Sequence, residues 1–284
     1  MRSLAKYLKR YRKESILAPL FKLLEAMFDL LVPIVVARMI DSGVIAGQKS
    51  TVFLCFGALV LMAAVGLLCS VTAQYFAAKA SVGTAGALRQ ALFDHIQRLS
   101  FSQLDNLGSD TLITRISGDV NQVQTGLNMG LRLLLRSPFI VFGAMIMAFT
   151  ISVKCALVFA VTIPILFAVT FGIMMVSIPL FGKAQAGLDR VTALTRENLT
   201  GVRVIRAFCR EEQSVAEFEE KNSGLTKLNL FVGRISALMN PLTYVLINAG
   251  TVALIRYAGM QVNLGALEQG QVVALYNYML QIIV

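Results

Sequence analysis

Uncharged and charged stretches alternate along this 284-residue chain. The 28 residues at 155–182 carry no charge, and neither do the stretches at 50–78 and 235–255. About 20 apolar residues rising 1.5 Å each cross a hydrocarbon core of roughly 30 Å, so each stretch is long enough for a membrane helix. Three further apolar runs are shorter or more polar, and together with them the sequence predicts six membrane segments. They lie at 15–36, 50–78, 137–153, 155–182, 235–255 and from 270 onward.

The connections between these segments alternate in length. Those at 38–49, 152–154 and 256–269 are short, whereas 79–136 and 183–234 each exceed 50 residues. All short connections therefore lie on one side of the membrane. Apolar residues recur at helical spacing in both long connections, which predicts that the membrane helices continue as amphipathic rods beyond the bilayer.

Lysine and arginine predict the orientation. The first 13 residues and the two long connections hold 21 of the 26 basic residues. The positive-inside rule makes this side cytoplasmic, together with the N-terminus. We expect a multi-pass plasma-membrane protein and, as a separate expectation that the charge distribution does not address, that this is a bacterial cell membrane.

Composition fits a membrane protein better than a soluble one. Hydrophobic residues make up 56% of the chain, against about 45–50% in soluble domains. The net charge of +10 is explained mostly by the basic residues on the predicted cytoplasmic side, so nucleic-acid binding is a much weaker interpretation of it. The cysteines have no metal-ligand spacing, so we expect packing residues, no metal site and no disulfide framework, and His95 is expected at a solvated helix position. The cysteines are Cys55, Cys69, Cys155 and Cys209.

The stretch 185–222 carries 13 charged residues in 38, directly after an uncharged run. The pattern predicts a helix that breaks near Leu199–Gly201, resumes over 202–208 and becomes acidic at Glu211. A charged helix that leaves a membrane helix in this way is expected to meet something soluble.

This stretch resembles the second cytoplasmic loop of ATP-binding cassette (ABC) exporters. The resemblance implies a short coupling helix that docks into a nucleotide-binding domain, with Arg206, Phe208 and Glu211 at the docking surface. The positions that carry it are Arg196, Glu197, Gly201, Val204, Arg206, Ala207, Phe208, Glu211 and Phe218.

The first long connection is similar to the first coupling loop of the same family. It breaks at 99–108, after which Ser109 or Asp110 is predicted to cap a new helix. Arg115 and Asp119 stand at i and i+4, where opposite charges face each other. The resemblance places Phe101 and Asp105 at the docking surface, with Arg115 and Asp119 supporting the loop.

The stretch 262–274, with Tyr276 and Tyr278 after it, resembles the last external turn and sixth helix of these exporters, so the resemblance covers residues 1–284. It implies an all-α, six-helix exporter (type IV) transmembrane domain with long cytoplasmic extensions and two coupling helices. It further implies a dimer whose halves exchange helices, and a nucleotide-binding domain that is fused or separate. The resemblance implies a substrate of the drug, lipid or peptide class. The sixth segment is cut at Val284, which suggests a fragment, with a split gene as the alternative.

No stretch forms a phosphate-binding P-loop, G-x-x-x-x-G-K-[ST]. The closest, 43–50, has its second glycine one residue early and Gln48 before the lysine. We therefore expect no ATPase activity from this chain alone, and expect ATP and Mg²⁺ on the nucleotide-binding domain.

Polar residues within the membrane segments are candidates for a substrate cavity, because such residues face a bundle interior or cavity. Glu25 and Asp29 share one face of the first segment and could attract a cationic substrate. The structural alternative, which we favour, pairs Lys22 with Glu25 and bonds Asp29 to another helix. Interhelical hydrogen bonding explains the other candidates equally well. These are Asn240, Thr243, Asn248, Thr251, Tyr276, Asn277 and Gln281.

Three alternatives to an exporter stay open. An importer could use the same fold. A secondary transporter driven by an ion gradient would need a buried proton or sodium site, for which Glu25 and Asp29 are the candidates. A regulatory or receptor subunit would transport nothing by itself.

Overall fold

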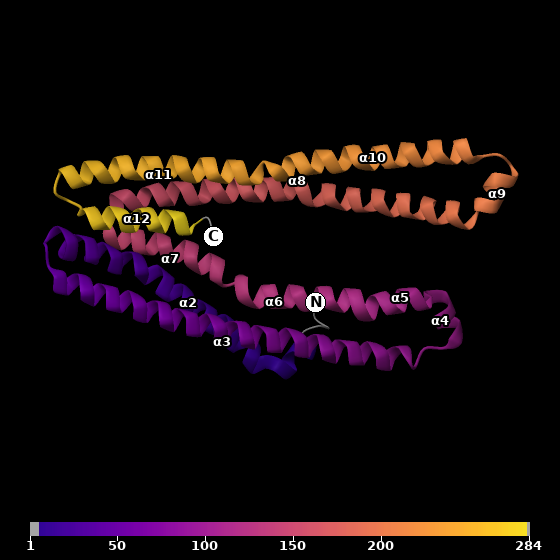
Figure 1. The fold of residues 1–284 in the computed structure, drawn as a ribbon, viewed down its shortest axis with the longest axis horizontal. Coiled ribbons are helices and arrows are strands. Elements are labelled where there is room, and N and C mark those ends of the chain that lie inside the picture. The colour runs from indigo at the N-terminus through magenta and orange to yellow at the C-terminus, as the bar shows by residue number, and fades with distance from the viewer. Residues whose placement is uncertain (1–5, 283–284) are drawn as a thin grey trace. The chain divides into compact units, whose positions relative to one another are not determined.

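The computed structural model describes residues 6–282, and every element in this range is helical. Contacts divide the chain into two units, 1–157 together with 254–284, and 158–253. The predicted basic flank begins at Met1 and the predicted sixth segment runs to Val284, so these predictions lie partly outside the described residues. Figure 1 shows the helices.

The first unit contains most of the elements. It begins with η1 (Lys9–Tyr11), α2 (Arg12–Arg38), the π-helix η2 (Met39–Ile45) and the 48-residue α3 (Lys49–Ile96). Its remaining elements are α4 (Phe101–Leu107), α5 (Ser109–Thr114), the π-helix η3 (Arg115–Asp119), α6 (Val120–Leu133), α7 (Arg136–Ile151) and α12 (Gln269–Gln281).

The second unit is a helical hairpin. The chain enters it along α8 (Val153–Thr200) and turns through the short α9 (Val202–Ala207). It continues through α10 (Glu211–Ala237) into α11 (Met239–Asn263), whose last residues return to the first unit. The predicted break at 199–201 and the restart at 202 are confirmed.

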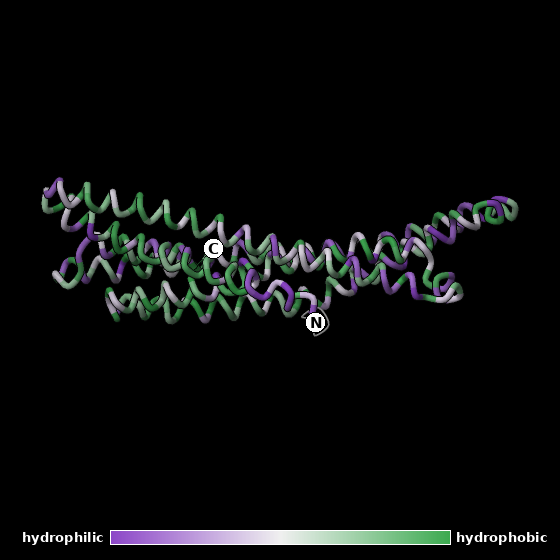
Figure 2. Tube along the Cα trace, turned by 90° about the horizontal axis from the view of Figure 1, so that it is seen from below, coloured by the Kyte–Doolittle hydropathy of each residue, from purple (hydrophilic) through white to green (hydrophobic). Residues whose placement is uncertain are grey.

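Within residues 6–282, four helical stretches are long and apolar enough to cross a membrane: Lys49–Ile96, Ser109–Ile151, Val153–Thr200 and Glu211–Asn263. They contain four of the six predicted segments. The first predicted segment lies in α2, which carries more charge, and the sixth in the short α12. In Figure 2 the trace is mostly hydrophobic over the parts of these stretches that lie away from α4 and α9, and hydrophilic and hydrophobic residues alternate toward the ends that carry α4 and α9.

Small residues let α2 and α3 approach closely. Ala73, Ala77 and Ala80 of α3 are buried, as are Ala18 and Ala26 of α2. The α3 alanines recur every three or four residues and the two α2 alanines lie eight residues apart, about two helical turns, which puts them on one side of each helix. Close backbone approach through such residues is the usual way in which helices pack where surrounding lipid is as apolar as the side chains.

Three of the four cysteines pack as predicted, but the prediction is wrong for the fourth. Cys55, Cys69 and Cys155 are buried. Cys209 is exposed and has a positive φ of 50°, because it occupies the turn that separates α9 from α10. His95 is exposed on α3, as predicted.

The beginning of α12 is fixed on the end of α2 and on the π-helix η2 that follows it. The backbone N–H of Gly270 donates to the Asp41 carboxylate at 2.6 Å. A Cβ atom at position 270 would overlap the carbonyl oxygen of Ala37 and the carboxylate of Asp41. Glycine is therefore required here by close approach between two helices, rather than by an unusual φ angle.

We expect Gly270→Ala to destabilise the protein by about 1–3 kcal/mol, because overpacking forces two helices apart. The measurement is thermal unfolding of the purified protein in detergent. Gly259→Ala is the matched control, since nothing lies within 4 Å of a Cβ there and alanine favours a helix interior. Equal stability of the two variants would contradict the close contact.

Candidate functional site

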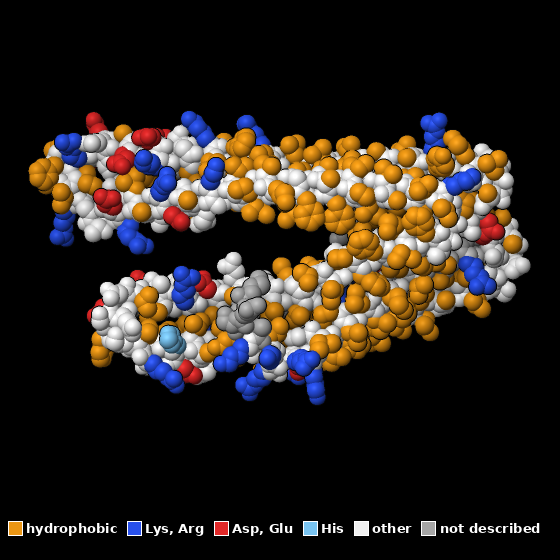
Figure 3. Space-filling model, turned by 180° about the vertical axis from the view of Figure 1, so that it is seen from behind, with side chains coloured by type: hydrophobic (Ala, Val, Ile, Leu, Met, Phe, Trp, Pro, Cys, Tyr) orange, Lys and Arg blue, Asp and Glu red, His pale blue; other side chains and the backbone are white. Residues whose placement is uncertain are grey.

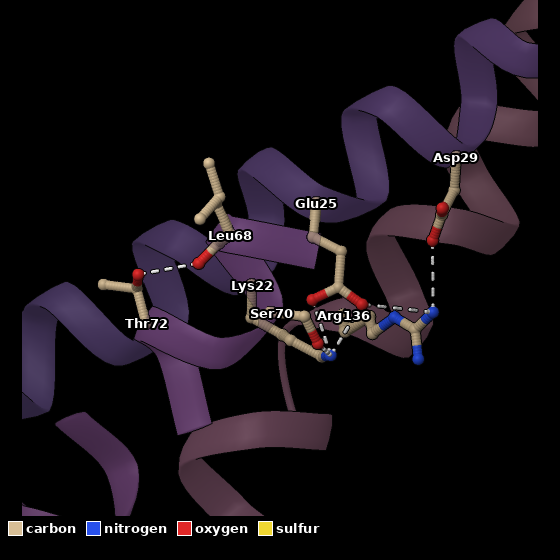
Figure 4. Close-up of polar contacts among 7 residues, drawn as sticks. All are labelled: Lys22, Glu25, Asp29, Leu68, Ser70, Thr72 and Arg136. Atoms are coloured by element: carbon tan, nitrogen blue, oxygen red, sulfur yellow. Dashed lines mark hydrogen bonds and ion pairs between the residues drawn. The ribbon is translucent and has the colours of Figure 1, made fainter. Parts of the chain in front are cut away.

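Four charged side chains gather between α2 and α7 (Figure 4). The Lys22 ammonium donates to both oxygens of Glu25, at 2.8 and 2.6 Å, and lies 3.5 Å from the Ser70 hydroxyl of α3. Arg136, the first residue of α7, donates to the Asp29 carboxylate at 3.2 Å and lies 4.0 Å from Glu25. Lys22, Glu25 and Asp29 share a face of α2 because they are spaced three and four residues apart.

The cluster is balanced in charge, with two cations and two carboxylates. Lys22 is only 7% exposed, so an unpaired charge would be costly there. Mutual pairing removes that cost, and the structural interpretation of Lys22, Glu25 and Asp29 is therefore the one that the contacts support. A role of Glu25 and Asp29 in a substrate cavity stays a prediction.

Two side chains of α12 hold backbone carbonyl groups of α2. Pro33 has no N–H, so the carbonyl oxygen of Asp29 lacks its intrahelical donor. Gln281 donates to that oxygen at 3.1 Å. The hydroxyl of the buried Tyr278 donates to the neighbouring carbonyl oxygen of Leu30 at 2.7 Å. The proline in α2 thus provides a docking point for α12.

An apolar groove of about 490 Å³ runs between α2 and α7. Met27 and Leu31 of α2 face Phe139 and Phe142 of α7 across it. Neither Glu25 nor Asp29 is among its lining residues.

The short helix α4 is stabilised by its own sequence. The Ser100 hydroxyl accepts from the backbone N–H of Gln103 at 3.4 Å, and the Gln103 side chain accepts from the Ser100 N–H at 3.1 Å. This reciprocal capping box satisfies two N–H groups that a helix start would leave free. Ser-x-x-Gln is a sequence signal for such a helix start, whereas the apolar pattern at 99–108 predicts only a break between helices.

The predicted cap of the next helix is wrong. Gly108 occupies the N-cap position of α5 with a φ of 74°, and no side chain caps that helix. Ser109 and Asp110 are instead the first helical residues, because the left-handed turn at glycine starts α5 one residue earlier. The predicted pair of Arg115 and Asp119 is confirmed as an ion pair within η3.

The predicted docking residues lie at the ends of the long helices, distributed over both units. Phe101 begins α4 and is 87% exposed, and Phe208 follows α9 and is 74% exposed. Asp105 and Arg206 are exposed on the same two short helices. Glu211 is the first residue of α10, where the helix dipole stabilises a negative charge.

The remaining cavity candidates are also divided between the units. Asn240, Thr243 and Asn248 belong to the part of α11 in the second unit, and Tyr276 and Asn277 belong to α12 in the first. A cavity shared by them stays a prediction. Within residues 6–282, no group of three or more His, Cys, Asp or Glu residues could hold a metal ion.

The sequence model of a family described as "ABC transporter transmembrane region" matches residues 15–284. This chain belongs to that family. The matched range contains the charge cluster and both short helices of the ABC transmembrane region.

Named relatives agree with this ABC family membership. The chain is 30% identical over 280 residues to an "Uncharacterized ABC transporter ATP-binding protein" of Mycobacterium tuberculosis, covering 99% of this chain and 48% of that protein. It is 30% identical over 283 residues to YfiB of Bacillus subtilis, covering 98% and 48%, and 26% identical over 281 residues to YfiC, covering 98% and 46%. The chain spans about half the length of these relatives.

We expect Lys22→Met to lower the free energy of unfolding by about 3 kcal/mol. The Glu25 carboxylate would then have Arg136, at 4.0 Å, as its remaining cationic partner. The double variant Lys22→Met/Glu25→Gln should be more stable than the single one, since it leaves no unpaired carboxylate. Thermal unfolding of the single variants and the double variant forms a double-mutant cycle. Strictly additive losses would show that the pair has no coupling energy.

Proposed function

We propose that this chain forms the membrane-spanning half of an ATP-driven transporter of the exporter type. In this proposal all six predicted segments cross the membrane, and the N-terminus, α4 and α9 lie on the cytoplasmic side. Two such halves form a dimer, and each works with a nucleotide-binding domain that holds ATP and Mg²⁺. Cargo of the drug, lipid or peptide class crosses by alternating access.

The observation that carries the proposal is the exposure of Phe101 and Phe208 on two short helices. Each short helix joins two longer helical stretches, and neither aromatic side chain lies in an uncharged apolar run. Phe101 is flanked by serines, with Arg98 and Asp105 within four residues. Phe208 has Arg206 and Arg210 two residues away on either side. An aromatic side chain in such a place is a good anchor for a pocket on a partner protein. Family membership makes the nucleotide-binding domain the natural partner.

The long helices explain how docking could be coupled to transport. The 48-residue α8 would reach about 70 Å, more than twice the thickness of a hydrocarbon core. A rigid-body shift of α9 would therefore be carried into the membrane part of α8, since only Gly201 separates the two helices. The hydrogen bond from Arg89 of α3 to Asn121 of α6, at 2.6 Å, ties the corresponding pair in the first unit.

The paired state of Glu25 and Asp29 supports an ATP-driven machine over an ion-driven one. Both carboxylates already have cationic partners from Lys22 and Arg136, whereas a proton-coupling site needs a carboxylate that gains and loses its charge. Dissipating the proton gradient should accordingly leave transport running while ATP is present.

We expect Phe208→Ala to lower ATP-driven transport about 30-fold or more, the effect of losing an interface anchor worth about 2 kcal/mol. Transport by the complete protein with its nucleotide-binding domain is measured in vesicles, alongside membrane insertion, which should be unchanged. Leu264→Ala, at an equally exposed apolar residue between α11 and α12, is the control. Normal transport by Phe208→Ala would refute the docking role.

A further inference from the structure

A dense basic segment precedes the first long helix. Between residues 6 and 13 five side chains are cationic, none is acidic, and all five cations are exposed. Figure 3 shows these lysine and arginine side chains gathered over η1 and the beginning of α2, beside an apolar surface. We call residues 6–13 the basic segment. Its cations are Lys6, Lys9, Arg10, Arg12 and Lys13.

The basic segment is fixed against the protein. The ring of Tyr11 packs directly on Gly83 of α3, where a Cβ atom would overlap the ring. Tyr7, Leu8 and Tyr11 are all partly buried, while the cations between and beside them point to the surface. The five charges are therefore held together on one part of the surface instead of being spread along a free tail.

The nearest carboxylate does not neutralise this surface. Glu14 is bonded to Lys79 of α3 at 3.2 Å. Its own backbone N–H and then Lys79 hold the pKa of Glu14 below its usual value, so the carboxylate stays charged and paired. Because Lys79 offsets Glu14, the excess of positive charge remains.

The exposed face of α2 continues directly from these cations into apolar residues. Arg12, Ile16, Leu20 and Leu24 follow one another at intervals of four residues, and Ile16 and Leu20 are each 56% exposed. If Ile16 and Leu20 contact acyl chains, the cations one turn earlier lie at the level of the lipid headgroups. The polar and apolar parts of this surface thus match those of a lipid.

We propose that the basic segment is a binding site for anionic phospholipid headgroups. Clusters of four to eight Lys or Arg residues beside a membrane helix attract anionic lipids, with about a fivefold gain in binding for each cation. The occupant is a lipid rather than a soluble anion, because the apolar half of the surface is continuous with the charged half. This site requires only that the chain lies in a membrane, and does not depend on docking at α4 or α9.

The test compares thermal unfolding of the complete protein in phosphatidylcholine nanodiscs with and without phosphatidylglycerol. The variant Lys9→Gln/Arg10→Gln/Lys13→Gln removes three charges from the basic segment. The matched control Lys49→Gln/Lys154→Gln/Arg256→Gln removes three exposed charges from the short connections. Equal melting temperatures of both variants and the unmodified protein in pure phosphatidylcholine show that all three are folded.

We expect phosphatidylglycerol to raise the melting temperature of the unmodified protein and the control, and to have little effect on the basic-segment variant. The variant should bind this lipid on the order of 100-fold more weakly, the product of three fivefold losses. Lys9→Arg/Lys13→Arg should keep the shift, and so should Phe208→Ala, which separates this site from the docking role. An unchanged shift in the basic-segment variant, an equal loss in the control, or the same shift with soluble glycerol phosphate would overturn the proposal.

Discussion

The need to satisfy polar groups of α2 in apolar surroundings is the constraint on which the first unit depends. A backbone group or charge without a partner costs several kcal/mol in hydrocarbon. Lys22, Glu25 and Asp29 bring three charges into α2, and Pro33 frees a carbonyl group. Lys22 and Glu25 pair within α2, whereas the Asp29 carboxylate and the free carbonyl group find their partners on α7 and α12, in Arg136 and Gln281. These contacts favour the packing of α7 and α12 on α2 that brings both partners into reach.

The sequence predicts the local half of this arrangement and not the distant half. Lys22 and Glu25 are one helical turn apart, so helix geometry alone brings them together, and their pairing is confirmed. Arg136 lies 107 residues from Asp29, and Gly270 lies 229 residues from Asp41. Periodicity within one helix says nothing about which helix packs beside it. The sequence therefore predicts that Asp29 bonds to another helix, but not which residue on which helix is its partner.

The ends of the long helices show a second limit of sequence patterns. The breaks are predictable because apolar periodicity stops there, but the local geometry depends on competition between neighbouring residues. At Gly108 the positive φ of 74° is available only to glycine without strain, and it takes the cap position from Ser109. At Cys209 a positive φ occurs at a residue that rarely adopts it, so composition alone could not identify that turn.

Exposed apolar residues have different meanings along this chain, and neighbouring charge distinguishes them. Leu61 and Leu68 are exposed within an uncharged helical run, and hydrocarbon can cover them without any protein partner. Phe101 and Phe208 are more exposed but lie among charged residues at helix ends, where lipid tails would have to meet those charges. A protein surface can pair charges and bury an aromatic ring at once, as lipid cannot. Ile16 lies between these extremes, since it belongs to an apolar row that begins four residues after the exposed Arg12, and a lipid with an anionic head and an apolar tail matches that order of charge and apolar residues.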